Sequence, residues 1–278
     1  MFRTIRAALA ALPLVLSLAT AAQASPLRAG FDAVSLGRND DGSSRAVQIG
    51  FDADFFGQTF TSLFVNNNGN VTFDAPLRSY TPFDLTSTGR PIIAPFFADV
   101  DTRHVGDAVA YGRGTVDGRD AFGVTWRDVG FYGSRSDSPD RLNTFQMVLV
   151  SRSDTGAGNF DIEFNYGAIN WEAGRASGGD GRGLGGRTAR AGFSNGTRAD
   201  GTFHEIAGSG TAGAFLDWNA DSGLANTSNV GIDGRHVFTA REGSVTAPPA
   251  VPLPAGLPLL LAGIGAIGVM RLRRKRAA

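Results

Sequence analysis

The sequence predicts an all-β fold of mainly antiparallel strands, in which one domain forms a sandwich or a barrel-like structure. Three observations support this prediction. Apolar and polar residues alternate over several short stretches, as they do in strands with one buried face. The chain contains 38 glycines, many of them in short polar stretches typical of turns. Helical periodicity of useful length is missing from the long central part, so short strands joined by Gly-rich turns are expected there.

The N-terminal residues have the three parts of an export signal. Arg3 and Arg6 form a basic start, residues 7–22 are apolar or small, and Ala24 completes an A-x-A cleavage motif. We therefore expect a helical signal peptide that ends at Ala24, with Ser25 as the mature N-terminus. The alternative is a buried N-terminal helix.

Two dipeptides, Asn68-Gly69 and Asp117-Gly118, predict β-hairpins, because both are strong signals for a two-residue type I′ turn. Such turns define the register of the strands on either side. The expected cross-strand pairs are Phe64 with Phe73 and Val65 with Thr72 in the first hairpin, and Tyr111 with Val124 and Val109 with Trp126 in the second.

Two further strands are expected on either side of a loop over residues 151–159. Residues 160–166 alternate between apolar and polar types, which predicts a strand with one buried face and one wet face. Residues 145–150 are more uniformly apolar, which predicts a strand covered on both faces. The 20 phenylalanines supply apolar area for a core, and we expect Trp126, Trp171 and Trp218 to lie in it.

The last 28 residues contain a motif, an apolar stretch and a basic cluster in that order. The motif is Val251, Pro252, Leu253, Pro254 and Ala255, and the basic cluster is Arg271, Arg273, Arg274, Lys275 and Arg276. As a helix, residues 251–270 would reach about 30 Å, just enough to cross a bilayer. The basic end would then stay on the cytoplasmic side. Residues 244–250 read as a Pro/Ala linker before this transmembrane helix.

This tail resembles the PEP-CTERM class of sorting signals in its VPLPA variant. The resemblance implies that a membrane enzyme, exosortase, recognises and processes the tail. The helix would then anchor the chain only in transit, and the mature protein would stand at the bacterial cell surface or in the extracellular matrix. A permanent anchor is the alternative.

The charge of the central part differs from that of the whole chain, whose formal net charge is zero. Seven of the 26 basic residues lie in the two ends, whereas all 26 acidic residues lie between them, so residues 25–250 carry a net charge of −7. An acidic exported domain is a poor nucleic-acid binder and a plausible host for Ca²⁺. The absence of cysteine excludes disulfides, thiol catalysis and Cys-type zinc sites.

Several short motifs lie between the two ends. In chain order they are Phe55-Phe56-Gly57, 63–73 (LFVNNNGNVTF), 93–103 (IAPFFADVDTR), 143–146 (NTFQ), 164–167 (FNYG) with Trp171, 191–193 (AGF), 228–231 (SNVG), Gly234-Arg235 and Val237-Phe238. Together they resemble the NIDO domain, the nidogen-like extracellular domain of nidogen, alpha-tectorin and membrane mucins. We expect the domain to span residues 25–243, with its best match over 51–240.

The resemblance implies a non-enzymatic protein that takes part in cell–matrix adhesion. Its partner would be a matrix protein or an exopolysaccharide, in addition to exosortase and, during transit, the membrane. Two alternatives remain at this point. One is a structural matrix component that assembles with itself. The other is a secreted hydrolase in which Ser194, part of a formal G-x-S-x-G match, acts with His204 or His236.

Two acidic motifs are candidate metal ligands, although no cofactor is otherwise expected. Asp99 and Asp101, spaced by two, could help to bind structural Ca²⁺, and Arg103 could instead neutralise both. Asp217, Asn219 and Asp221 resemble the opening of an EF-hand loop, but serines stand where the loop needs glycine and its bidentate glutamate. A polar turn is the alternative there.

Overall fold

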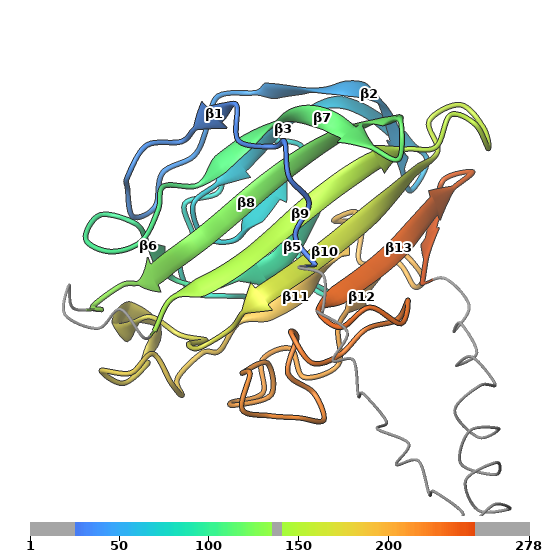
Figure 1. Cartoon of the computed structure of the whole chain (residues 1–278). Helices are drawn as coiled ribbons and strands as arrows, with labels where there is room; N and C mark the ends of the chain where they lie inside the picture. Colours follow the sequence, from blue (N-terminus) through green and yellow to red (C-terminus); the bar gives the residue numbers. More distant parts are fainter. Residues whose placement is uncertain (1–25, 135–140, 248–278) are drawn as a thin grey trace, which may run out of the picture.

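A computed structural model describes residues 26–134 and 141–247, which form two antiparallel sheets packed face to face (Figure 1). The first sheet has the order β1-β7-β8-β9-β10-β13-β14, with β6 beside β8. Its strands are β1 (Val34–Ser35), β6 (Val100–Asp101), β7 (Ala110–Val116), β8 (Arg119–Phe131), β9 (Asn143–Ser151), β10 (Phe160–Ala168), β13 (Arg235–Arg241) and β14 (Ser244–Thr246).

The second sheet has the order β12-β11-β5-β4-β3-β2. Its strands are β2 (Val47–Phe55), β3 (Gln58–Asn66), β4 (Asn70–Thr72), β5 (Ile92–Phe97), β11 (Arg190–Ser194) and β12 (Phe203–Glu205). A short 3₁₀ helix, η1 (Arg175–Ser177), is the one helix in the described ranges. The predicted all-β sandwich is confirmed, whereas the two predicted terminal helices fall outside the described residues.

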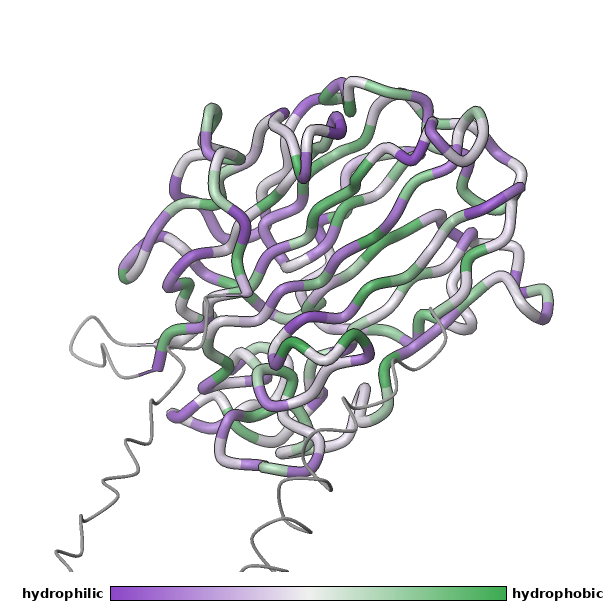
Figure 2. Tube along the Cα trace, turned by 45° about the vertical axis from the view of Figure 1, so that its right-hand side comes forward, coloured by the Kyte–Doolittle hydropathy of each residue, from purple (hydrophilic) through white to green (hydrophobic). Residues whose placement is uncertain are grey.

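Aromatic side chains fill the space between the sheets, where β5 packs against β9 and β2 against β8. The rings of Trp126 and Phe145 stack with their centroids 5.1 Å apart, and Phe96 lies 5.1 Å from Phe145 and 5.7 Å edge-on from Trp171. Burial of such rings is the main stabilising contribution in a fold without disulfides. Figure 2 shows hydrophobic residues following the strands and hydrophilic ones in the peripheral loops.

One of the two predicted hairpins has the expected register. Tyr111 pairs with Val124, and Asp117 and Gly118 both have positive φ, as a type I′ turn requires. In the other hairpin the pairs are Phe64 with Thr72 and Val65 with Val71, so the predicted register was wrong by one residue. The cause is a three-residue loop, 67–69, in place of the expected two-residue turn.

Strands β9 and β10 and the loop between them lie where the sequence predicted them, but of the polar side chains expected on the solvent face of β10 only Asp161 is partly exposed. Glu163 and Asn165 point to the expected solvent side and are nevertheless 6% and 0% exposed. The N-terminal segment crosses this outer face (Figure 1), where the Arg28 guanidinium bonds both carboxylate oxygens of Glu163 at 3.0 and 2.9 Å. Arg235 donates to the Asn165 amide oxygen at 2.9 Å. Distant residues therefore cover a face that local alternation assigns to water.

Candidate functional site

The loop 67–69 between β3 and β4 organises one end of the sandwich. Gly69 has φ +74°, and a Cβ at this position would lie 1.7 Å from the carbonyl oxygen of Phe96, so only glycine fits. The loop is held from the core side by the Trp126 indole N–H, which donates to the carbonyl oxygen of Asn67 at 2.9 Å. A turn built this way needs three residues, which explains the shift of register.

The asparagines of this loop tie two other segments together. The Asn67 amide donates to the carbonyl oxygens of Asp40 and Val100. The Asn68 side chain also bonds to both segments. Its amide donates to Asp41 Oδ1 at 2.8 Å, and its oxygen accepts the Val100 N–H at 2.9 Å. Both asparagines are almost fully buried. Asn67 and Asn68, which belong to the motif 63–73, thus position the segment 36–46 against the end of β5.

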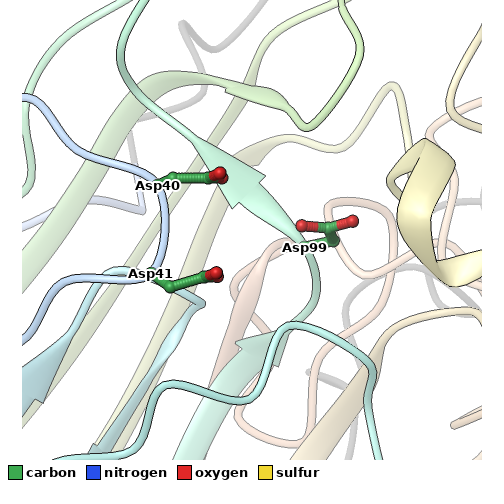
Figure 3. Close-up of side chains that lie close together, drawn as sticks. All are labelled: Asp40, Asp41 and Asp99. Carbon is green, nitrogen blue, oxygen red and sulfur yellow. The ribbon is translucent and has the colours of Figure 1, made fainter.

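Three aspartates meet at this junction (Figure 3). Asp40 and Asp41 come from the segment between β1 and β2, and Asp99 lies between β5 and β6. One carboxylate oxygen from each lies within 4.8 Å of the others. Asp99 is 2% exposed, whereas Asp40 and Asp41 are partly exposed. The cluster is therefore buried at Asp99 and open to solvent at Asp40 and Asp41.

The predicted pair of Asp99 and Asp101 is divided between two environments. Asp101 is buried and receives two bonds from the Arg103 guanidinium, at 3.0 and 2.8 Å, so this half of the predicted ion-pair network is present. Arg103 also lies 2.9 Å from Asp40 Oδ2. Asp99 has no ion pair with any residue that the structure describes, and Oδ2 of Asp99 has no hydrogen-bond partner there.

The crowding of carboxylates changes their acidity. Burial raises the pKa of Asp99 to about 7, and the charges of Asp40, Asp41 and Asp101 act in the same direction, while the Ser177 backbone N–H opposes them. Burial also raises the pKa of Asp40 to about 6, helped by Asp101 and Asp41 and opposed by Arg103. Both shifts mean that negative charge at this site is costly without a nearby cation.

The second predicted metal motif forms a hydrogen-bonded turn. Asp217 Oδ1 accepts the Ile169 N–H at 3.0 Å, and Asn219 Oδ1 accepts the N–H groups of Asp221 and Ser222 at 3.2 Å each. These bonds are those of a polar turn, the alternative weighed from the sequence. A metal role for Asp217, Asn219 and Asp221 stays a prediction.

Ser194 lies in an environment unlike that of a hydrolase nucleophile. It is fully buried on β11, and its Oγ accepts the N–H of Gly196 at 3.1 Å. His204 pairs with Phe193 across the sheet, and His236 contacts Thr227 at 3.3 Å. Neither histidine has a hydrogen bond to Ser194 in the described part of the chain. An elbow that presents its serine at a strand-to-helix turn is not formed here.

Trp218 corrects another expectation from the sequence. Trp126 and Trp171 are fully buried in the core, but the Trp218 side chain is 73% exposed. It lies on the long connection between β12 and β13, which protrudes from one end of the sandwich (Figure 1), and its ring packs over Gly213. Tryptophan is enriched among the residues that carry most of the binding energy at protein interfaces.

The predicted processing sites lie outside the described residues. These are the signal cleavage site at Ala24 and Ser25, the sorting motif 251–255 and the basic cluster 271–276. Over residues 26–134 and 141–247, no helix has the length and apolar character needed to cross a membrane.

Comparison with known proteins identifies the family of the chain. The family model of the nidogen-like domain matches residues 61–117 and 110–242. The chain is 39% identical to alpha-tectorin of Mus musculus over 222 residues, which are 72% of this chain and 10% of that protein. It is 28% identical to nidogen of Drosophila melanogaster over 225 residues, 71% of this chain and 15% of that protein.

Nidogen-2 of Mus musculus is 36% identical over 149 residues, which are 44% of this chain and 11% of that protein. The chain thus spans about a tenth of the length of the alpha-tectorins it matches. No solved structure matches it. The matched residues run through strands of both sheets, from β3 to β13. The chain belongs to the nidogen-like domain family.

Proposed function

We propose that this chain is an exported surface or matrix protein whose nidogen-like domain attaches to a matrix protein or an exopolysaccharide. The family carries this proposal, because the match extends over both sheets. The relatives that cover most of this chain are alpha-tectorin and nidogen, proteins of the extracellular matrix. The chain is not an enzyme, as its family indicates.

The exposed Trp218 is the residue best placed to anchor such a partner. Indole rings supply large rigid contact area at low entropic cost, and they stack on sugar rings as well as on protein surfaces. The acidic surface, with a net charge of −7 over residues 25–250, argues against nucleic acid as the partner. It also opposes self-assembly by charge repulsion.

A pull-down with the purified mature protein tests the proposal against matrix polysaccharide and surface proteins from the producing cells. We expect wild type and Tyr80→Ala to retain a partner and Trp218→Ala to lose it. Tyr80 is a matched control because it is also an exposed aromatic residue, at 40%. No retained partner in calcium or in EDTA would contradict adhesion, and concentration-dependent light scattering would then favour the self-assembling alternative.

We further propose that the VPLPA-like tail is removed by exosortase after transient anchoring in the membrane. The support is the order of motif, apolar stretch and basic cluster in residues 251–276. Mass spectrometry of both termini of the protein isolated from the cell surface checks this. A mature N-terminus at Ser25 and the loss of the basic cluster are expected, whereas an intact C-terminus would indicate a permanent anchor.

A further inference from the structure

We propose that Asp40, Asp41 and Asp99 bind a calcium ion that fastens the segment between β1 and β2 to the end of β5. The three carboxylates come from segments 58 residues apart in the chain, and Figure 3 shows Asp99 opposite the other two. Calcium binds carboxylate oxygens at about 2.3–2.6 Å, so oxygens up to about 4.8 Å apart can share one ion. The separation of the three ligand atoms, within 4.8 Å, meets this condition.

Unsatisfied oxygens at the cluster point independently to a cation. Asp99 Oδ2 and Asp40 Oδ1 are both buried, and neither has a hydrogen-bond partner among the residues described. Buried polar atoms in folded proteins are nearly always paired, and an orphaned carboxylate oxygen calls for an ion or a water. At Asp99, which is 2% exposed, bulk solvent supplies little compensation. Proximity alone does not indicate a cation, and the unpaired buried oxygens on two of the three aspartates are a second observation that favours one.

The charge balance favours a divalent ion over a further hydrogen bond. Four carboxylates lie at this junction, those of Asp40, Asp41, Asp99 and Asp101, and Arg103 supplies one positive charge to Asp101 and Asp40. When all four carboxylates are ionised, the excess is three negative charges. A divalent ion between Asp40, Asp41 and Asp99 neutralises most of it without moving Arg103 from Asp101.

The ligand type and the partly open side suit calcium. Carboxylate oxygens are hard donors, which excludes soft metals as the preferred occupant. Magnesium requires near-ideal octahedral bonds of about 2.0–2.1 Å, whereas calcium tolerates irregular sets completed by water and carbonyl oxygens. Asp40 and Asp41 are partly exposed and leave a route for the ion from solvent. Three protein carboxylates on an extracellular module indicate a Kd of about 10⁻⁴–10⁻³ M.

The asparagines of the loop 67–69 make the site rigid. The amides of Asn67 and Asn68 bond the Asp40 carbonyl and the Asp41 carboxylate, and both side chains bond Val100, the residue after Asp99. The ligands are therefore positioned before an ion binds. The proposed site is formed by described residues alone, and its binding of calcium does not depend on adhesion to a matrix partner.

Thermal unfolding of the full chain in a mild detergent, in EDTA and with added CaCl₂ or MgCl₂, tests the site. Calcium at about ten times its Kd should raise the melting temperature of a domain of this size by roughly 3–6 °C. Asp99→Asn should melt higher than wild type in EDTA, because it removes an uncompensated buried charge, and it should lose the calcium response. Asp200→Asn, an exposed aspartate elsewhere, should behave as wild type.

A second variant keeps the test decisive if Asp99→Asn does not fold. Asp41→Asn retains an oxygen for the Asn68 amide and removes one ligand charge, so it should fold and bind calcium more weakly in a calorimetric titration. An unchanged calcium response in Asp99→Asn or Asp41→Asn would overturn the proposal, as would no response in wild type at millimolar CaCl₂. An equal response to MgCl₂ would overturn the choice of calcium.

Discussion

Glu163 and Asp99 are both buried carboxylates, but they differ in whether a cation lies beside them. Glu163, on the outer face of β10, receives two bonds from Arg28. Its neighbour Asp161 is paired with both Arg152 and Arg241. Asp99, at the end of β5, shares its surroundings with other carboxylates and pairs with no cation of the described chain. Among the described residues, the carboxylates of the β10 face have arginine partners and Asp99 has none.

The difference has an energetic basis. Taking a carboxylate out of water costs several kcal/mol, and a well-placed guanidinium recovers most of that cost. On the β10 face the N-terminal segment supplies this guanidinium. At the Asp99 junction, Arg103 is already bonded twice to Asp101. An external divalent ion would make the second region resemble the first.

The largest expected effect comes from breaking the loop that supports Asp99. Gly69→Ala should lower the free energy of unfolding by about 4 kcal/mol or more, since its Cβ would collide with the Phe96 carbonyl oxygen. Gly118→Ala is the matched control, because Gly118 has nearly the same φ, +77°, in a turn with open space around it. That variant should cost only about 1 kcal/mol. Urea unfolding of both proteins measures the difference, and equal losses would contradict the role of the loop.

His236 is a buried ionisable group that differs from both carboxylates, because it stays neutral in the folded protein. Burial lowers its pKa from 6.5 to about 4. His236 therefore binds a proton below about pH 6.5 in the unfolded chain but only below about pH 4 in the folded chain. The free energy of unfolding consequently falls as the pH falls through this window. The loss amounts to about 3 kcal/mol below pH 4.

The carboxylates of Asp40 and Asp99 titrate in the same window with the opposite sign, so the His236 contribution is read by difference. The free energy of unfolding of wild type and His236→Gln should be measured from pH 7 to pH 4 in urea. The variant should lose less stability over this range. Parallel curves would show that His236 is not held neutral.

One substitution can remove the cation that pairs with Glu163 on the β10 face. Arg28→Met should lower the free energy of unfolding by about 2–3 kcal/mol, because it leaves Glu163 buried without its cation, and Glu163→Gln in addition should restore most of this. Arg119→Met is the control, since its pair with Asp154 is exposed on both sides, at 41% and 44%. It should change the free energy of unfolding far less than Arg28→Met does, because solvent screens an exposed pair. Similar losses in both single variants would remove the distinction.

The smallest expected effect has the reverse sign. In EDTA, Asp99→Asn should raise the free energy of unfolding by about 1–2 kcal/mol, since it removes one of the uncompensated charges. Glu163→Asn should lower it, because there the charge has a partner. Urea unfolding at pH 7 compares the two variants. A loss of stability in Asp99→Asn would contradict the view that Asp99, unlike Glu163, is an uncompensated buried charge.

Local patterns in the sequence predicted what depends on neighbouring residues. The alternation over residues 160–166 located β10, Asp117-Gly118 set the register of β7 and β8, and the spacing of Asp101 and Arg103 anticipated their ion pair. The same reasoning did not find Asp40 or Asp41. Asp40-Asp41 reads as an ordinary polar turn, and the one sequence signal nearby in space is the asparagine run 66–68, whose burial only the structure shows.

The sequence by itself determined the strands, one hairpin register, the family motifs and the acidic character of the central part, because periodicity, turn chemistry and composition act over a few residues. Only the tertiary structure decided which polar faces are covered, that Trp218 is exposed, and that Asp40 and Asp41 meet Asp99. These outcomes depend on how two sheets and their connections pack, which brings together residues far apart in the chain. Within residues 26–134 and 141–247, the same packing gives Glu163 an arginine partner and gives Asp99 none, and this distinction is a property of the assembled sandwich.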